Sequence, residues 1–255
     1  MLVQVTDKIW SHLLHIRNNT TCSCQDNWSS GERAALDLYT PLARRDRGPF
    51  TLAQIGQSLD GRIATVTGDA RDISGPDGLE HLHRMRALVD GVVIGVRTAL
   101  HDSPRLTVRL CEGKNPARIV IDPRGRLPDD VHLFRRDGTR RIVIQSVDRP
   151  RPAGVTVIRL QLKNGTIDPR EIITALRDEG LSTLLVEGGG ITIAKFLENG
   201  LLNRLHVGIA PLLIGDGPQS ITLSSPSEML ANAIRPKMRA YSLGSDVMLD
   251  CKMPH

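Results

Sequence analysis

The 255-residue chain has few aromatic side chains, no disulfide-like cysteine pattern and no long apolar run. Phe, Trp and Tyr together make up 3% of the residues, which argues against a surface that stacks nucleic-acid bases on aromatic rings. No segment approaches the roughly 18 apolar residues of a membrane-spanning helix, and the N-terminus has histidines and polar residues where a signal peptide needs an apolar stretch. We therefore expect a cytoplasmic protein without a membrane partner.

The four cysteines are one C-x-C pair and two distant single residues. They are Cys22, Cys24, Cys111 and Cys251. This spacing fits neither a disulfide framework nor the C-x-x-C pairs of common zinc sites. We interpret all four as free thiols, and we predict no metal site.

The net charge is +5, from 33 Lys and Arg residues against 28 Asp and Glu residues. The arginines occur in short groups with acidic residues between them, whereas nucleic-acid-binding proteins usually concentrate basic residues. Binding of small anionic ligands explains the modest excess at least as well. We keep a nucleic-acid-binding protein as the alternative from another functional class and expect no nucleic-acid partner.

From Pro49 onward, strand-like and helical patterns alternate along the chain. The strand-like runs are 50–56, 62–65, 91–95, 118–122, 141–145, 155–160, 183–187 and 204–210. The clearest helical patterns are 76–89, 168–179 and 191–199. This alternation predicts an α/β fold, a three-layer α/β/α sandwich with a largely parallel sheet. The C-terminal part is typical of a hairpin that turns at Gly244 and Ser245, so the sheet is predicted to be mixed.

Residues 1–48 differ in character from the rest of the chain. We predict an N-terminal extension and linker over residues 1–48 and one domain over residues 49–255. Apolar residues between Ile9 and Ile16 predict one or two amphipathic helical turns, followed by a loop over residues 18–34. The extension carries no chemistry that we identify; it packs on the main domain, packs on a partner subunit, or is partly disordered.

The stretch LLVEGGGITIAKFL, residues 184–197, places three glycines between a strand and a helix. Glycines let the backbone approach a phosphate, and the first N–H groups of a helix are unpaired donors at the positive end of its dipole. The spacing matches neither G-x-G-x-x-G nor G-x-x-x-x-G-K-[ST]. An anion cradle and a tight turn without a ligand therefore both remain open. Glu187, at the carboxyl end of the strand, needs a hydrogen-bond donor and would suit the N–H groups of a heterocycle.

Three other segments point to the same edge of the sheet. Asp60, in a Ser-Leu-Asp-Gly turn, either caps backbone amides or faces a ligand. Residues 98–104 are predicted to form a turn, and Arg109, at the end of an alternating apolar run, would suit a phosphate. Residues 122–126 contribute one aspartate and two arginines at a strand end, and they form either part of a site or a charged loop.

In this order and spacing, the segments resemble the pyrimidine reductase family of riboflavin biosynthesis, whose fold is that of dihydrofolate reductase. The resemblance covers about residues 50–252. It rests on SLDGR at 58–62, VIGVRTALHDSPRLTVR at 93–109, RIVID at 118–122, LLVEGGG at 184–190 and IAPLLIG at 209–215. It implies that NADPH reduces the ribosyl group of a 5-amino-6-(5-phosphoribosylamino)pyrimidine to a ribityl chain, with hydride passing to C1′ of the opened ribosyl imine. Because members of this family are commonly homodimers, a homodimer is implied as well.

The resemblance also implies two sets of site residues. The substrate contacts are Arg86, Leu106, Arg109 and Glu187. The cofactor contacts are Gly56, Asp72, Thr98, Asp102, Gly189, Gly190, Ile191 and Thr192. A protonated imine accepts hydride readily, so orientation and proximity can supply most of the acceleration. We therefore assign no catalytic residue.

The chain departs from the family pattern at several positions. Many bacterial members have a lysine where this chain has Gln54, and Asp-Asp-Pro where it has Asp102, Ser103 and Pro104. The H-x-E and P-C-x-x-C elements of the deaminase domain of many bacterial members are absent, and about 48 residues are too few for that domain. These departures leave both the aminated and the deaminated pyrimidine open as substrate. The alternative is a paralogue that reduces another pterin- or flavin-like compound.

Overall fold

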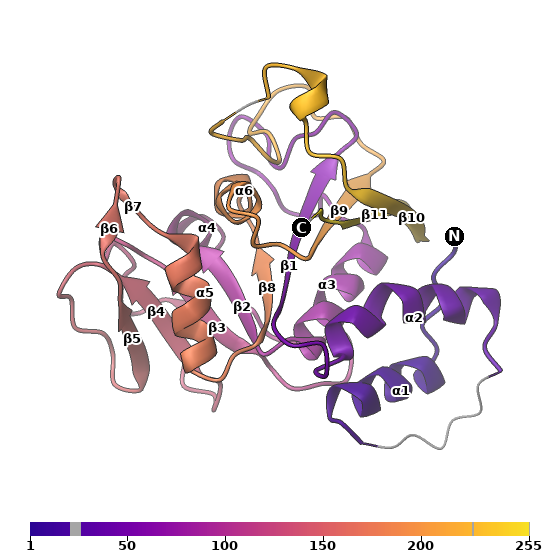
Figure 1. Cartoon of the computed structure of the whole chain (residues 1–255), viewed down its shortest axis with the longest axis horizontal. Coiled ribbons are helices and arrows are strands. Elements are labelled where there is room, and N and C mark those ends of the chain that lie inside the picture. Colours follow the sequence, from indigo (N-terminus) through magenta and orange to yellow (C-terminus); the bar gives the residue numbers. More distant parts are fainter. Residues whose placement is uncertain (21–26, 226, 255) are drawn as a thin grey trace.

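The computed structural model describes residues 1–20, 27–225 and 227–254, and its centre is a nine-stranded sheet (Figure 1). In spatial order the strands are β10 (Lys237–Leu243), β11 (Asp246–Lys252), β9 (Arg204–Ala210), β1 (Phe50–Ser58), β8 (Thr183–Glu187), β2 (Gly91–Gly95), β3 (Ala117–Ile121), β4 (Arg141–Gln145) and β5 (Val155–Arg159). The strands from β9 to β5 are parallel to one another, whereas β11 is antiparallel to both β9 and β10. The predicted mixed, mostly parallel sheet with a C-terminal hairpin is confirmed.

Helices cover both faces of this sheet (Figure 1). One face packs against α1 (Asp7–Arg17), α2 (Ser30–Ala43), α3 (Pro76–Leu88) and α4 (Val96–Asp102), and the other against α5 (Pro169–Asp178) and α6 (Gly190–Glu198). Leu52 and Ala53, neighbours on β1, belong to the two separate cores, because successive side chains of a strand point to opposite faces. The three-layer α/β/α arrangement is thus confirmed. The smaller elements are the hairpin β6 (Leu162–Lys163) and β7 (Thr166–Ile167) and the 3-10 turns His132–Phe134 and Leu230–Asn232.

Local signals explain where the helices begin. Asp168 accepts a hydrogen bond of 2.9 Å from the backbone N–H of Arg170 and caps α5, as its place before a proline predicts. At the start of α2, Ser29 and Glu32 form a reciprocal capping box. The loop predicted over residues 18–34 is therefore wrong from Ser30 onward, although the S-x-x-E signal was present in the sequence.

Two further predictions differ from the structure. Residues 62–65 form no strand, since Arg62 makes one isolated bridge to Gln219 and the Ile63 N–H donates to the Pro218 carbonyl at 3.0 Å. A neighbouring loop thus takes the hydrogen bonds that a strand would need. Residues 98–104 are not a simple turn, because α4 extends to Asp102 and ends at Ser103 in the left-handed conformation.

The described part of the N-terminal extension packs on the main domain, which is one of the three alternatives left open above. Leu13 of α1 and Leu38 of α2 are fully buried in the same core as Leu52 of β1. Asp90, just before β2, accepts hydrogen bonds from Arg17 at 2.6 Å and from Arg45 at 2.9 Å. Apolar burial and charge therefore join the extension to the sheet.

Within the described ranges, no helix combines the length and the hydropathy needed to cross a bilayer. Cys111 and Cys251 are free thiols, as predicted, while Cys22 and Cys24 lie outside the described residues. Burial raises the pKa of the Cys111 thiol to about 11, despite the nearby Arg84. This thiol is thus protonated near neutral pH.

Candidate functional site

A cavity of about 1590 Å³ lies at the carboxyl edge of the central strands, where open parallel sheets bind ligands. All eight predicted cofactor contacts line it: Gly56, Asp72, Thr98, Asp102, Gly189, Gly190, Ile191 and Thr192. Three of the four predicted substrate contacts line it as well: Arg86, Leu106 and Glu187. One cavity therefore contains residues from Gly56 to Thr192, which are more than 130 positions apart in the sequence.

Arg86 and Glu187 form a buried ion pair at the wall of the cavity. The Arg86 Nε and Nη2 atoms donate to the two carboxylate oxygens of Glu187 at 2.8 and 2.7 Å, and Nη1 donates to the Thr107 carbonyl at 3.2 Å. Burial alone would lower the pKa of Arg86, but the charge and hydrogen bonds of Glu187 outweigh it and raise the pKa. The donor that Glu187 requires is thus Arg86, and the two predicted substrate contacts hold each other.

Arg109 lies outside the lining of the cavity and its side chain is exposed. Its backbone N–H donates to Nδ1 of His83 at 2.8 Å, and its guanidinium contacts the Thr107 hydroxyl. Burial, followed by the charges of Arg86 and Arg109, lowers the pKa of His83 to about 4. His83 is therefore a neutral acceptor that ties the 107–109 segment to α3. The role of Arg109 in substrate binding stays a prediction.

Two predicted contacts have strained backbones. Leu106 has a φ of 51° and Asp72 a φ of 61°, the left-handed region that side chains other than glycine seldom adopt. Conformations of this kind cost about 1–3 kcal/mol each and tend to cluster at functional sites. At Leu106 the strained backbone accompanies an almost fully buried side chain in the cavity lining.

The glycine turn between β8 and α6 needs glycine for two different reasons. Gly188 has a φ of +85°, and a Cβ there would lie 2.7 Å from Cγ2 of Thr98. A Cβ on Gly190 would lie 1.6 Å from the Ser220 carbonyl oxygen, which no side chain can occupy. Gly189 donates its N–H to the Thr98 hydroxyl at 3.0 Å. These contacts pack the turn tightly against α4 and the 218–224 loop.

The first turn of α6 is open toward the cavity. Its N-cap is Gly189, which provides no side-chain hydrogen bond to the first helical N–H groups. Gly190, Ile191 and Thr192, in that first turn, all line the cavity. Unpaired N–H groups at the positive end of a helix dipole favour an anion, so a phosphate group fits this place.

Cationic side chains line the cavity on the side of β3 and α4. Arg97 follows β2, and Arg124 and Arg126 lie on the loop after β3; all three are exposed. Residues 122–126 were interpreted as either part of a site or a charged loop, and the structure places both arginines in the cavity lining. Because three guanidinium groups line the cavity, it favours a ligand with more negative charge than the first turn of α6 alone would bind.

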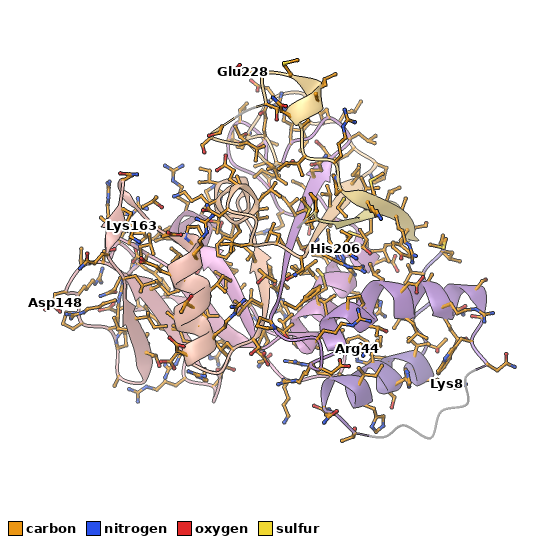
Figure 2. The ribbon with its side chains drawn as sticks, viewed as in Figure 1. Lys8, Arg44, Asp148, Lys163, His206 and Glu228 are labelled. Atoms are coloured by element: carbon orange, nitrogen blue, oxygen red, sulfur yellow. The ribbon has the colours of Figure 1, made fainter. Side chains whose placement is uncertain are left out.

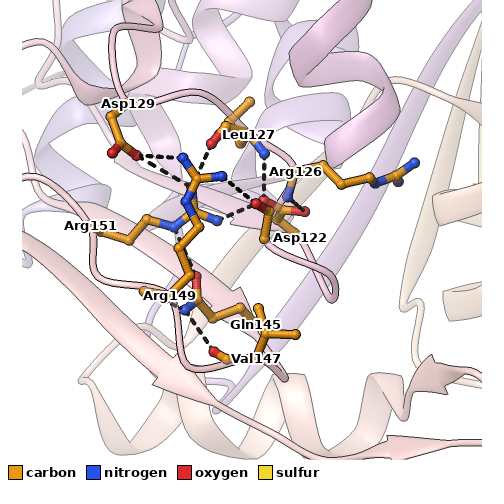
Figure 3. Close-up of polar contacts among 9 residues, drawn as sticks. Asp122, Arg126, Leu127, Asp129, Gln145, Val147, Arg149 and Arg151 are labelled. Atoms are coloured by element: carbon orange, nitrogen blue, oxygen red, sulfur yellow. Dashed lines mark hydrogen bonds and ion pairs between the residues drawn. The ribbon is translucent and has the colours of Figure 1, made fainter.

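Asp122 does not face the cavity but anchors this loop from below (Figure 3). Its carboxylate accepts the backbone N–H groups of Arg126 at 2.9 Å and Leu127 at 2.8 Å, and Nη2 of Arg151 at 2.7 Å. Arg151 also donates to Gln145 at 2.8 Å and to the Leu127 carbonyl at 2.7 Å. Asp122 and the Arg151 side chain are completely buried, so this ion pair is structural and fixes the loop that carries Arg124.

Asp60 is a turn residue rather than part of the cavity lining. It accepts hydrogen bonds from the Ser58 hydroxyl at 2.5 Å and from the backbone N–H groups of Ile214 at 3.1 Å and Gly215 at 2.7 Å. The Ser58 bond, together with these backbone donors, lowers the pKa of Asp60 to about 2. Of the two interpretations above, capping of backbone amides is the one observed.

Two further parts of the lining were not among the predicted site residues. Gln54, on β1 beside Glu187, is only 8% exposed, lines the cavity, and has no hydrogen-bond partner for its amide among the described residues. Its deviation from the family lysine was the only available signal. Residues from Pro218 to Ser224 contribute as well, but this loop after β9 carries no motif and reaches the cavity only through the fold.

A family model described as the RibD C-terminal domain matches residues 49–248. The riboflavin biosynthesis protein RibD of Actinobacillus pleuropneumoniae is 30% identical over 211 residues, which are 79% of this chain and 56% of that protein. A 2,5-diamino-6-ribosylamino-4(3H)-pyrimidinone 5′-phosphate reductase of Methanothermobacter thermautotrophicus is 32% identical over 213 residues, which are 79% of this chain and 97% of that protein. The chain thus spans about half the length of the bacterial relative and nearly all of the archaeal one.

Solved structures show the same fold. A Thermotoga maritima diaminohydroxyphosphoribosylaminopyrimidine deaminase/5-amino-6-(5-phosphoribosylamino)uracil reductase superposes with a TM-score of 0.71 and 24% identity, over 88% of this chain and 62% of that one. The riboflavin biosynthesis reductase Rib7 of Saccharomyces cerevisiae superposes with a TM-score of 0.66 and 24% identity, over 81% and 90% of the two chains. The Thermotoga protein therefore extends further beyond the matched region than the Saccharomyces reductase does.

Proposed function

Because the chain belongs to the RibD C-terminal domain family, we propose that it reduces the ribosyl group of a 5-amino-6-(5-phosphoribosylamino)pyrimidine to a ribityl chain with NADPH, as a step of riboflavin biosynthesis. The observation that carries this proposal is the single cavity that combines the Arg86–Glu187 pair with the open first turn of α6. One part suits a polar heterocycle and the other a phosphate. A cytoplasmic location and a homodimer stay predictions.

NADPH fits the side of the cavity formed by α4, α6 and the loop after β3. The first turn of α6 would hold the pyrophosphate through the N–H groups of Gly190 and Ile191, which have no capping side chain, and through the Thr192 hydroxyl. Arg97 and Arg124 offer guanidinium groups that would favour the additional phosphate of NADPH over NADH. When bound there, the nicotinamide supplies a hydride equivalent.

The pyrimidine fits the side formed by β1, β8 and α3. Leu82 and Leu106 provide apolar walls for a ring, and the Gln54 amide offers one acceptor and one donor group to its edge. The Glu187 oxygens each bind Arg86 but keep lone pairs that can accept a ring N–H. These residues would orient the substrate, while C1′ takes up hydride and the imine nitrogen takes up a proton. Orientation is therefore the main contribution that we assign to the protein.

The direct test mixes the protein with NADPH and either the aminated or the deaminated ribosylaminopyrimidine phosphate and follows loss of the reduced nicotinamide absorbance. We expect oxidation of NADPH with one of the two compounds and a much slower reaction with NADH. In parallel, NADPH should raise the melting temperature more than NADH does, because a ligand that binds the native state stabilises it.

The outcomes separate the parts of the proposal. A melting shift with NADPH but no oxidation with either pyrimidine would contradict the substrate and leave an NADPH-dependent enzyme for another compound. The absence of any shift would contradict the cofactor. Reactions without pyrimidine are the control for uncoupled oxidation.

A further inference from the structure

A row of buried polar residues crosses four neighbouring strands beneath α3. The strand registers pair Glu187 on β8 with Gln54 on β1, Gln54 with His206 on β9, and His206 with Asp250 on β11. Paired residues of neighbouring strands point to the same face of a sheet. Glu187 and Gln54, at one end of the row, line the cavity, and Asp250, at the other end, is buried on β11 of the C-terminal hairpin.

The N-terminal extension reaches this row through Tyr39 of α2. The Tyr39 hydroxyl lies 2.7 Å from Nδ1 of His81 on α3, and Nε2 of His81 lies 3.3 Å from Nδ1 of His206. Nε2 of His206 lies 3.3 Å from Oδ1 of Asp250, without the alignment of a hydrogen bond. Tyr39, His81 and His206 are fully buried, and Figure 2 labels His206 near the N-terminal helices. We name Tyr39, His81, His206 and Asp250 the tyrosine–histidine chain.

Burial determines the direction of these hydrogen bonds. Burial raises the pKa of Tyr39 far above its ordinary value and, helped by the nearby His206 and Arg84, lowers the pKa of His81. The phenol therefore stays protonated and donates a hydrogen bond to Nδ1 of the neutral His81. Nε2–H of His81 then donates to Nδ1 of His206, whose own Nε2–H faces the Asp250 carboxylate. The reverse direction would turn an unprotonated nitrogen toward that carboxylate.

Two side chains of α3 consequently hold the helix to the sheet, in addition to the N–H of its N-cap Gly75, which donates to Asp246 of β11 at 2.9 Å. His81 holds it to β9 and Arg86 holds it to β8. The two residues are five positions apart, about 7.5 Å along a helix axis, and their partners lie two strands apart, about 10 Å. A shift or rotation of α3 that disturbed the first contact would also displace Arg86 from Glu187.

We propose that Tyr39 and His81 are positioning residues for the pyrimidine side of the cavity, through their hold on α3. The N-terminal extension is then part of the functional unit, because its helix α2 supplies the first hydrogen bond of the chain. Neither residue lines the cavity, so both act through Arg86 and Glu187. The kinetic consequence rests on the proposed reductase function; the geometric one does not.

Tyr39→Phe tests the proposal because it removes one hydroxyl and keeps the ring in the core. Leu42→Val is the matched control, since Leu42 is also fully buried on α2 and lies outside the tyrosine–histidine chain. We expect Tyr39→Phe to raise the KM for the pyrimidine phosphate by about 10-fold, as small misplacements of a binding group do, with NADPH affinity unchanged. Leu42→Val should lower the melting temperature and leave both values near those of the wild type.

The second readout is the NMR signal of the Arg86 Nε–H, assigned with Arg86→Lys, and it needs no activity. We expect Tyr39→Phe to shift this signal and to speed its exchange with water by about 10-fold, because this hydrogen bond to Glu187 is weakened. Leu42→Val should change neither. An unchanged signal in Tyr39→Phe, or equal changes in both variants, would overturn the proposal. If the wild type reduces neither pyrimidine, the proposed function fails and the Nε–H signal still decides this inference.

Discussion

Two buried carboxylate–arginine pairs lie at the same edge of the sheet, and they differ in what surrounds them. Asp122 is enclosed: two backbone N–H groups and Arg151 use its oxygens, and neither Asp122 nor the Arg151 side chain is exposed. Glu187 accepts side-chain hydrogen bonds from one partner, Arg86, and both residues line the cavity. The two pairs share a charge arrangement but not an environment.

The comparison shows how environment divides structural from functional charge. A buried pair whose carboxylate oxygens are both bound by donors of the protein, away from any cavity, stabilises a loop and has little to offer a ligand. A pair that lines a cavity keeps hydrogen-bonding capacity for a ligand, which can replace the water that otherwise solvates it. Loss of the Asp122 pair should therefore damage the fold most, and loss of the Glu187 pair should damage function most.

The largest expected effect on stability is that of Asp122→Asn. The amide removes the charge that balances Arg151 and turns hydrogen donors toward other donors, so we expect a loss of about 3–5 kcal/mol in the free energy of unfolding. Denaturant unfolding measures this value. Asp148→Asn is the control, because Asp148 pairs with Arg159 through a side chain that is 78% exposed and should contribute only about 0–1 kcal/mol. Equal losses in the two variants would contradict the structural role of Asp122.

Glu187→Gln should show the reverse pattern, with an intermediate cost in stability and a large cost in activity. The amide oxygen still accepts one hydrogen bond from Arg86 and water can reach the cavity wall, so we expect a loss of about 1–2 kcal/mol in stability. Under the proposed function, kcat/KM for the pyrimidine should fall by about 100-fold while NADPH affinity is retained. Glu179→Gln, which alters an exposed pair with Arg140, is the control. A variant with wild-type kinetics would remove Glu187 from the site.

The smallest expected effect is a dependence of the free energy of unfolding on pH, which comes from two histidines of α3. His81 and His83 on α3 have pKa values lowered chiefly by burial, to about 4 for His83. Between the unfolded pKa near 6.5 and the folded one, the unfolded state binds more protons, so stability is constant above about pH 6.5 and decreases as the pH falls below it. Each histidine contributes a slope of up to about 1.4 kcal/mol per pH unit.

Denaturant unfolding from pH 8 to pH 5 gives this slope, and His83→Gln should flatten it because glutamine does not titrate in this range. No histidine contacts the exposed Asp148–Arg159 pair among the described residues, so Asp148→Asn should leave the slope unchanged. A slope that stays the same in His83→Gln would contradict the neutral, buried state of His83.

The parts of the site that could be predicted are those with local signatures. The glycine turn, the acidic end of β8 and the arginine-rich loop after β3 each combine a residue pattern with a strand end, and parallel strands place such ends at one edge. Gln54 and the 218–224 loop carry no such signature. Their place at the cavity depends on which strands are neighbours, and that depends on contacts distant in the sequence.

The same distinction applies to the N-terminal extension. The sequence alone determined an amphipathic segment near Ile9, the alternation of strands and helices after Pro49, and the order of the five motif blocks, because periodicity, turn chemistry and spacing are local properties. Only the tertiary structure decided that Arg86 is the partner of Glu187, that Asp122 is enclosed, and that Tyr39 meets His81. Hydrogen bonds between buried side chains depend on how helices settle on a sheet, and this packing is a property of the whole chain.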